Sequence, residues 1–346
     1  MLKFNRQYKL QISTVKSTSM TDFVNGITIY SELSPLTCEF NFSKACLSSV
    51  QYGRIKLYNL NQAHRDLLFK DPFDYGYQDS SGATTQNRWI KMEAGYNGNL
   101  SLILNGIIME CTSYRESGST NVITEIDVYD FSGIYTNSTT NKTLEKCTRQ
   151  DVINLLVGDI LKANPGTQAG CIAPVDNQGN LVYGDTYSRG RTLTGDSWKS
   201  LMTETHNQGF VEHGIIQLLG DNDVLKPEAG IENVLTVNSG TGLLSTPRKR
   251  DAYLTLHMLF EPSIKLGQLV KIQGLFPTYG NIQNLNSGHV NDPYYKVIGY
   301  DHMGTISGAT GGKCVTVMRL NSGTIRFNQQ LGTFTSNPSE LASLPS

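Results

Sequence analysis

The sequence has little charge for its length and no apolar segment long enough to span a membrane as a helix. Charged residues make up 17% of the 346 residues, and 29 basic against 30 acidic residues give a net charge of −1. This balance excludes a strongly basic nucleic-acid coat protein and an acidic solvating tail. The longest apolar stretches, within 102–109, are broken by Asn105 and Gly106 and fall short of the roughly 20 residues of a transmembrane helix. We therefore expect no membrane insertion.

The sequence also has few cysteines and no apolar leader at its start. Residues from Lys3 to Ser13 alternate polar and apolar and lack the apolar core of a signal peptide, so we expect folding in a cytoplasm. No two of the six cysteines have the C-x-x-C spacing of a zinc or redox motif. In a reducing compartment we interpret them as small buried hydrophobic residues.

Three segments resemble functional motifs only in part. Gly308–Lys313 is similar to a phosphate-binding loop, but Cys314 stands where a Ser or Thr would hold magnesium. Asp221–Asp223 could begin a calcium loop, yet a leucine occupies the next ligand position. His206 and His213 flank a hairpin but form no H-E-x-x-H pair. No catalytic residue, metal or cofactor is predicted, although paired carboxylates for glycoside hydrolysis remain open because their approach is a tertiary property.

What the sequence does contain is typical of strands joined by turns: 33 Gly, 11 Pro and 17 Tyr. In Leu2–Ile12 the even positions are apolar, with Arg6 as the exception, which predicts a half-buried strand. Asn97-Gly98 is a strong signal for a two-residue hairpin between two further runs. A short helix is expected at Gln62–Phe69 and a polar loop at Gly76–Gln86. The other expected strands of this part are Ile27–Phe42, Val50–Tyr58, Trp89–Tyr96, Leu100–Cys111 and Val122–Tyr129.

The middle of the chain changes period. Thr148 and Asp151 form a capping-box pattern before apolar residues at helical spacing, and a second helix is expected from Asp196 to about His206. His213-Gly214 then predicts a hairpin, so this part is a small α+β domain. Strands return in the last part, at Val234–Val237, Ala252–Phe260, Leu269–Ile272, Tyr294–Tyr300 and Cys314–Leu320.

The two strand-rich parts show signs of an internal duplication. Lys91 and Lys271 each open a strand, and each is followed by a Tyr-x-x-x-Gly step, Tyr114–Gly118 in the first part and Tyr300–Gly304 in the last. We interpret these steps as junctions between equivalent strands, which predicts two β blocks with the same strand order.

The order of the motifs resembles baseplate hub proteins of contractile-tailed bacteriophages, such as the T-even and Mu-like hub that carries the central spike. The resemblance is carried by a glycine–leucine turn and proline in Gly242–Pro247, then a strand that ends in Glu261-Pro262, then Gly267 before the next strand. Tyr295–Val297 followed by His302–Gly304 continues the pattern. It covers about residues 3–320 and includes Arg54–Asn59, Lys91–Tyr96, Leu102–Ile108 and Trp198–Leu219.

The resemblance implies a mainly β (α+β) fold with two tube-type β-barrel domains flanking a small α+β domain. The implied ranges are 1–139 for the first barrel, 140–229 for the α+β domain, 230–320 for the second barrel and 321–346 for an extended C-terminal arm. It also implies a homotrimer, in which two similar barrels per chain give a ring with pseudo-sixfold symmetry.

Such a ring would join a sixfold tail tube to the threefold central spike and surround a channel. The implied partners are the spike protein, the tail tube or tube-initiator protein, the tape-measure protein and baseplate wedge or adaptor proteins, with DNA only in transit. The implied location is the virion tail baseplate, assembled in the host bacterial cytoplasm, and no enzymatic role is implied. The alternative is a tail-associated carbohydrate-binding or cell-wall-degrading β protein.

One basic cluster stands out as a candidate interface. Arg248, Lys249 and Arg250 follow Pro247 in a turn. Three such residues usually form a solvated surface, but in a hub they would contact a protein neighbour. They would not line the lumen, because cations there would attract DNA phosphates and slow passage. We expect the channel wall to consist mainly of Asn, Ser, Thr, Gln and scattered acidic residues.

Overall fold

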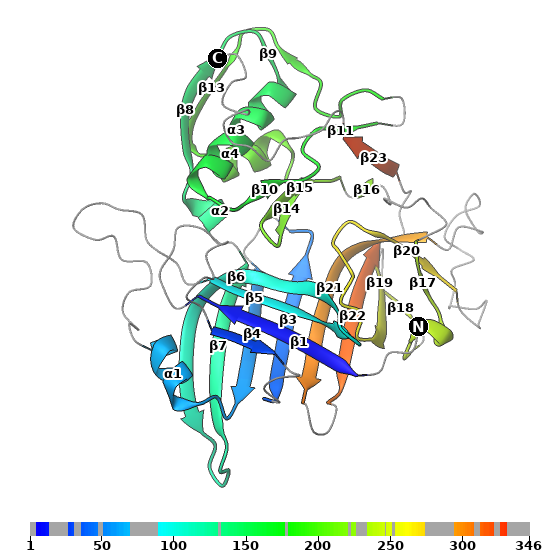
Figure 1. The fold of residues 1–346 in the computed structure, drawn as a ribbon. Helices are drawn as coiled ribbons and strands as arrows, with labels where there is room; N and C mark the ends of the chain where they lie inside the picture. Colours follow the sequence, from blue (N-terminus) through cyan, green and yellow to red (C-terminus); the bar gives the residue numbers. More distant parts are fainter. Residues whose placement is uncertain are drawn as a thin grey trace.

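Two blocks of β-strands and a smaller mixed part surround three hydrophobic cores (Figure 1). The mainly β, α+β fold class predicted from the sequence is confirmed. The computed structural model describes residues 5–13, 27–30, 36–47, 51–69, 89–130, 133–176, 179–220, 223–225, 234–245, 247–250, 253–273, 294–307, 312–321 and 326–330.

The first block follows the predicted alternation closely. Its strands are β1 (Arg6–Ile12), β2 (Ile27–Tyr30), β3 (Cys38–Ala45), β4 (Gln51–Tyr58), β5 (Trp89–Tyr96), β6 (Asn99–Arg115) and β7 (Val122–Asp130), with helix α1 (Gln62–Phe69). Asn97 and Gly98 both have positive φ (51° and 81°), as the two-residue hairpin between β5 and β6 requires. The predicted run 27–42 is two strands, and the loop expected at 76–86 lies outside the described residues.

The second block has fewer and shorter strands. They are β17 (Leu235–Val237), β18 (Arg248–Arg250), β19 (Tyr253–Leu259), β20 (Leu269–Ile272), β21 (Tyr294–Ile306) and β22 (Cys314–Asn321). In β19 the even residues are buried and the odd ones are not, so one face packs on the core.

The two blocks share a strand order, which confirms the predicted duplication. The order β3-β4-β7-β6-β5 in the first block corresponds to β18-β19-β22-β21-β20 in the second, and all these neighbours are antiparallel. Both long strands carry a register shift at the same place, after Ile108 in β6 and after Val297 in β21. When these shifts are aligned, Lys91 corresponds to Lys271, as predicted. The blocks differ beyond this core, because β1 is antiparallel to β5 whereas β17 is parallel to β20.

The predicted equivalence of the two Tyr-x-x-x-Gly steps is wrong. With the register shifts aligned, Tyr114 corresponds to Met303, and Tyr300 corresponds to Cys111. Tyr300–Gly304 lies inside β21 and does not separate two strands. The strand continues because His302 is buried on the core side, where it contacts Thr316 of β22, so the alternation extends to the end of β21.

The blocks are joined edge to edge. The second half of β21 pairs with β3 from Gly299–Ala45 to Ile306–Cys38. A continuous layer therefore runs β18-β19-β22-β21-β3-β4-β7-β6, and the first half of β6 turns back with β5, β1 and β2 across one side of it (Figure 1). The core between these two layers also takes in Phe260 of the second block.

The mixed part lies at one end of the β layers (Figure 1). Its helices are α2 (Gly133–Thr136), α3 (Arg149–Ala163) and α4 (Ser197–Glu204). Thr148 and Asp151 form the predicted capping box of α3, and Asp196 is the N-cap of α4 rather than its first residue. Its strands are β8 (Thr139–Leu144), β9 (Cys147–Thr148), β10 (Gln168–Ala169), β11 (Pro174–Val175), β12 (Thr186–Tyr187), β13 (Arg191–Asp196), β14 (Gly209–Glu212), β15 (Ile215–Leu218) and β16 (Asp223–Leu225).

Chain segments cross between these parts. Trp89 and Ile107 of the first block belong to the core of the mixed part, and Phe210 of β14 belongs to the core of the second block. After the last strand of the second block, β23 (Arg326–Gln330) pairs with β11 and β16 of the mixed part. The cores therefore bind the three parts together along their shared borders.

Candidate functional site

The continuous layer has one face that points away from both β cores, which we call the outer sheet face. In β3, β4, β7, β21 and β22 every second side chain is buried in a core, so the others point outward. The outward residues are Glu39, Asn41, Ser43, Tyr52, Arg54, Lys56, Tyr58, Glu125, Asp127, Tyr129, Asp301, Met303, Val315, Val317 and Arg319.

The cations that β4 and β22 place on the outer sheet face are paired with carboxylates. Arg54 holds Asp127 through two hydrogen bonds, Nε to Oδ1 at 2.8 Å and Nη2 to Oδ2 at 3.2 Å. Arg319 makes the same two-pronged contact with Asp301, at 3.0 and 3.2 Å. Lys56 lies 3.7 Å from Glu125. These strands therefore present ordered, internally neutralised ion pairs.

Tyrosines on the same face donate to these acids. Tyr52 donates to Asp127 at 2.6 Å, and Tyr58 donates to Glu39 at 3.0 Å. Partial burial, followed by these hydrogen bonds, raises the pKa of both phenols to about 12. Burial alone would raise the pKa of Asp127, but the hydrogen bonds from Arg54 and Tyr52 outweigh it and lower that pKa. At neutral pH the Asp127 carboxylate is therefore ionised and both phenols are protonated.

The half of this face that belongs to the second block is more apolar. Leu259, Val315 and Met303 stand side by side on β19, β22 and β21, and two of them are large side chains with more than a third of their surface exposed. Tyr253 on β19 is 52% exposed. An exposed apolar row beside a polar, ion-paired region is typical of a surface that meets other proteins.

The candidate interface Arg248–Arg250 forms β18 at the end of the continuous layer. Its register is Arg248 to Thr255 and Arg250 to Tyr253 of β19, and Arg248 is exposed. In the part of the chain that the structure describes, no strand pairs with the other edge of β18. The expectation that this cluster contacts a protein neighbour stays a prediction.

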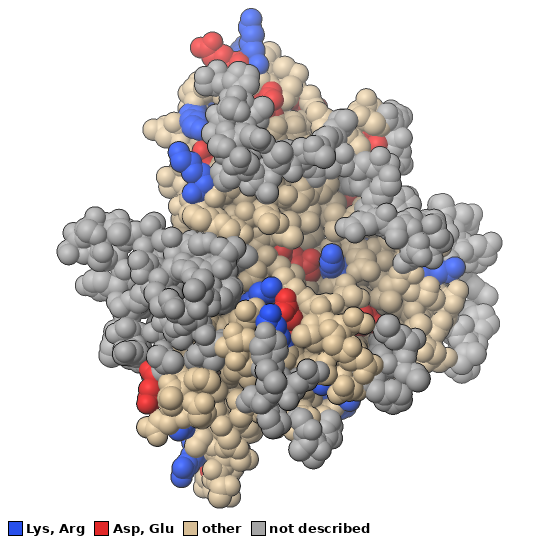
Figure 2. Space-filling view, in the orientation of Figure 1, with Lys and Arg blue, Asp and Glu red and all other residues tan. Residues whose placement is uncertain are grey.

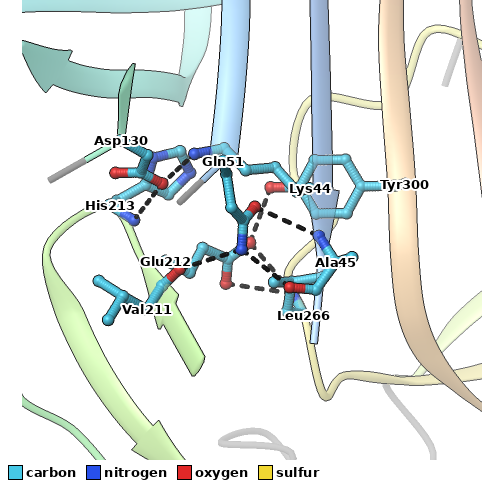
Figure 3. A network of polar contacts seen from close by, with 9 residues as sticks. All are labelled: Lys44, Ala45, Gln51, Asp130, Val211, Glu212, His213, Leu266 and Tyr300. Carbon is cyan, nitrogen blue, oxygen red and sulfur yellow. Dashed lines mark hydrogen bonds and ion pairs between the residues drawn. The ribbon is translucent and has the colours of Figure 1, made fainter. Parts of the chain in front are cut away.

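The three parts meet at a buried polar junction (Figure 3). Lys44 of β3 and Asp130 of β7 are each only 2% exposed, and the Lys44 ammonium contacts the Asp130 carboxylate directly. The Asp130 carboxylate also accepts from the backbone N–H of His213, at 3.3 Å, in the turn between β14 and β15. This pair thus links the first block to the mixed part through charges that water cannot reach.

Glu212 extends the junction to the second block (Figure 3). Its carboxylate accepts from the Tyr300 hydroxyl of β21 at 2.7 Å and from the Leu266 backbone N–H, which lies 3.1 Å from each oxygen. Gln51 of β4 donates to the carbonyl of Val211 at 3.3 Å. One short β14 segment therefore fixes the mixed part against both β blocks.

Burial shifts the pKa of each titratable group at the junction. It raises the pKa of Asp130 despite the opposing Lys44 charge, and it raises the pKa of Glu212 despite the bonds from Tyr300 and Leu266. It also lowers the pKa of His213 well below its usual value, with the Lys44 charge as the next cause. Such shifts come from a water-excluded environment, and the groups are engaged in holding structure.

We expect acid to destabilise the protein partly through His302. Burial, and then the Lys44 charge, lowers the pKa of this residue to about 3. An unfolded histidine titrates near 6.5, so this stability is present above pH 6.5 and is lost as the pH falls from there towards 3. Because only the unfolded state takes up the proton, the loss is about 1.4 kcal/mol per pH unit.

The measurement compares wild type with His302→Gln, which can still bond to Thr316. Between pH 6 and 4 the free energy of unfolding should fall less steeply with decreasing pH in the variant than in wild type. The difference in slope should correspond to one proton, about 1.4 kcal/mol per pH unit. The pKa values of Glu212 and Asp130 are raised, so these two groups make the protein more stable as the pH falls. Their contribution is the same in wild type and variant and cancels when the two slopes are subtracted. Equal slopes in the two proteins would contradict the assignment.

The junction was not predicted from the sequence, although a signal existed. The apolar, core-facing positions of β3 are followed at the same spacing by Lys44, and those of β7 by Asp130. A charged residue that continues an apolar alternation is a candidate buried charge. That each finds the other, and that Glu212 lies beside them, depends on tertiary structure.

The motifs weighed from the sequence lie only partly within the described residues. No group of three or more His, Cys, Asp or Glu side chains in the described ranges is arranged to hold a metal ion. His206 is exposed and lies 3.4 Å from Arg149, whereas His213 turns toward the buried junction. Residues 221–222 and 308–311 fall outside the described ranges. No described helix has the length and apolarity to cross a membrane.

The fold is similar to solved structures of tail proteins. A tail protein from Neisseria meningitidis MC58 matches with 11% identity and a TM-score of 0.46 over 93% of this chain and 98% of that one. The 43 kDa tail protein of prophage MuSo2 from Shewanella oneidensis matches with 7% identity and a TM-score of 0.49 over 91% and 96%. A Francisella PdpA–VgrG complex matches with 7% identity and a TM-score of 0.49 over 96% and 55%. Neither a family model nor a curated protein matches this sequence.

Proposed function

We propose that this chain is the structural hub of a contractile phage-type tail. In this role three copies form a ring that joins a sixfold tail tube to a threefold central spike. The observation that carries the proposal is the internal duplication, in which two blocks with the same strand order are paired side by side through β21 and β3. A threefold assembly of such a chain presents six similar units, which is what a junction between sixfold and threefold structures needs.

The outer sheet face is our candidate for the channel wall. The cations that β4 and β22 place on it are held by Asp127, Glu125 and Asp301. The pairing of Arg248 with Thr255 puts the exposed Arg248 of β18 on the same face, which does not fit the expectation that Arg248–Arg250 point away from the lumen. As a wall, this face would differ from the expected composition, because tyrosines and ion pairs outnumber Asn, Ser and Thr among the outward residues named above. Figure 2 shows the opposite side of the molecule, on which β1 lies.

The hub function accounts for the large polar surface and needs no catalytic group. Its partners would be the spike protein, the tail tube or tube-initiator protein, the tape-measure protein and wedge or adaptor proteins, with DNA in transit. The site of action would be the virion tail baseplate after assembly in the host bacterial cytoplasm. The domain ranges 1–139, 140–229, 230–320 and 321–346 belong to this proposal.

The test is the mass of the purified chain in solution, combined with a low-resolution image. We expect a trimer with a central channel and six similar units around it. Substituting Ala at Arg248, Lys249 and Arg250 should lower the trimer fraction and leave the free energy of unfolding of the monomer within about 1 kcal/mol, because charges at the surface of a sheet edge contribute little to stability. A monomer at all concentrations, or sugar release from peptidoglycan abolished by one Asp or Glu substitution, would contradict the proposal.

A further inference from the structure

We infer that the open edge of β6 at Thr112–Tyr114 binds β18 of a second copy of this chain, so that copies join head to tail through one continuous sheet. The inference rests on the proposed ring and specifies its interface. From Thr112 to Tyr114, β6 pairs with β7 on one edge. On the opposite edge, no strand within the described ranges pairs with these three residues.

The chain already contains one complete example of this contact. The strand that corresponds to β6 is β21, and its second half binds β3 on the edge opposite β22. The strand that corresponds to β3 is β18. The edge of β6 and the edge of β18 are therefore the two halves of a contact that is formed inside the chain and left open at its two ends.

The duplication also fixes the register. Aligning the register shifts makes Thr112, Ser113 and Tyr114 equivalent to Asp301, His302 and Met303. Following the ladders across each block makes Arg250, Lys249 and Arg248 equivalent to Ser43, Phe42 and Asn41. Within the chain these residues pair Asp301–Ser43, His302–Phe42 and Met303–Asn41. Between copies we therefore expect the pairs Thr112–Arg250, Ser113–Lys249 and Tyr114–Arg248.

The placement of the two edges favours a ring. In Figure 1 the β6–β7 pair and β18 lie at opposite sides of the continuous layer. One copy therefore offers an acceptor edge on one side and a donor strand on the other, which is a heterologous contact of the kind that forms a ring when its rotation closes.

The charges of the two edges favour pairing β18 with β6 over pairing β18 with a second β18. Two paired β18 strands would repel each other, because Arg248–Arg250 would place cations opposite cations. The β6 edge instead offers small or polar residues, with Glu110 exposed two residues before Thr112 and Glu125 hydrogen-bonded to Tyr114 at 2.9 Å. The same cations discourage pairing with unrelated strands, as edge lysines do in other sheets. A second copy of this chain is therefore the occupant that fits.

The experiment is disulfide trapping in the full chain. The in-register variant T112C/R250C places two cysteines directly opposite each other on the same face, within disulfide reach. The matched control T112C/R248C shifts one cysteine by two residues along the same face and out of reach. After mild oxidation we expect at least tenfold more cross-linked dimer and trimer on a non-reducing gel from the in-register variant, with the disulfide-linked peptide that joins positions 112 and 250 found by mass spectrometry. If T112C/R250C fails to fold, Y114C/R248C is the second in-register pair.

The outcomes separate this inference from the ring itself. A trimer by mass in which neither the in-register nor the out-of-register pair cross-links overturns the β6–β18 contact and leaves the ring. A wild-type chain that stays monomeric overturns the ring and this contact together. Equal cross-linking of both pairs overturns the register and with it the equivalence of the two interfaces.

Discussion

Replacing Lys44 by Met is expected to lower the free energy of unfolding by about 3–5 kcal/mol, because it leaves the buried Asp130 carboxylate without its counter-charge. Both side chains are 2% exposed, so water cannot take the place of the ammonium. The backbone N–H of His213 would be the remaining partner of Asp130, at 3.3 Å. Methionine keeps most of the volume of lysine, so the effect is electrostatic and not that of a cavity.

Two further variants test whether the loss comes from the unpaired buried charge. The double variant Lys44→Met with Asp130→Leu removes both charges, and we expect it to recover most of the loss, because a buried pair contributes little net stability over apolar residues. Lys56→Met breaks the half-exposed contact with Glu125 and should cost less than about 1 kcal/mol. Urea unfolding followed by circular dichroism measures all three. A Lys44→Met protein within 1 kcal/mol of wild type would show that the pair does not hold the junction.

Local sequence patterns account for most of the strands. Alternation located β4, β5 and β7 to within a few residues, whereas β2 and β3 were predicted as the single run Ile27–Phe42. The turn chemistry of Asn97-Gly98 located a hairpin. The ends of β6 and β21 were placed too early, because both strands continue past a register shift into the second layer. A bulge of this kind changes which side chains face inward, so a strict period of two cannot follow it.

The packing between the parts could not be read from the sequence. Phe260 ends a strand of the second block, yet its ring lies 5.6 Å from that of Phe40 in the first core. Trp89 begins a strand of the first block but belongs to the core of the mixed part. These residues look like ordinary strand residues, and only the folded chain brings them to a neighbouring core.

The prediction that the cysteines are small buried residues holds for four of the six. The six cysteines form no disulfide bond with one another, and Cys38, Cys147, Cys171 and Cys314 are buried. Burial raises the pKa of the Cys38 thiol, so it remains uncharged and unreactive in the core. Cys46 and Cys111 are half-buried.

A large loss in the free energy of unfolding is also expected when the contact between Glu212 and the second block is removed. Glu212→Leu leaves the Tyr300 hydroxyl and the Leu266 N–H without their buried acceptor, and each loss costs about 1–3 kcal/mol. Tyr300→Phe removes the donor and should cost about 1.5–3 kcal/mol, the range for a hydrogen bond to a charged group. Tyr58→Phe is the matched control, since Tyr58 donates to the partly exposed Glu39, and its loss should stay below about 1 kcal/mol.

The double variant Glu212→Leu with Tyr300→Phe separates this contact from the rest of the junction. If the two groups act through one hydrogen bond, the double variant is more stable than the sum of the single losses by about 1.5–3 kcal/mol, because the second substitution has no partner left to remove. Chemical unfolding of the four proteins gives this coupling energy. A coupling near zero would mean that Glu212 is held by Leu266 alone and that β21 and β14 are joined by apolar packing around Phe210, which lies in the core of the second block.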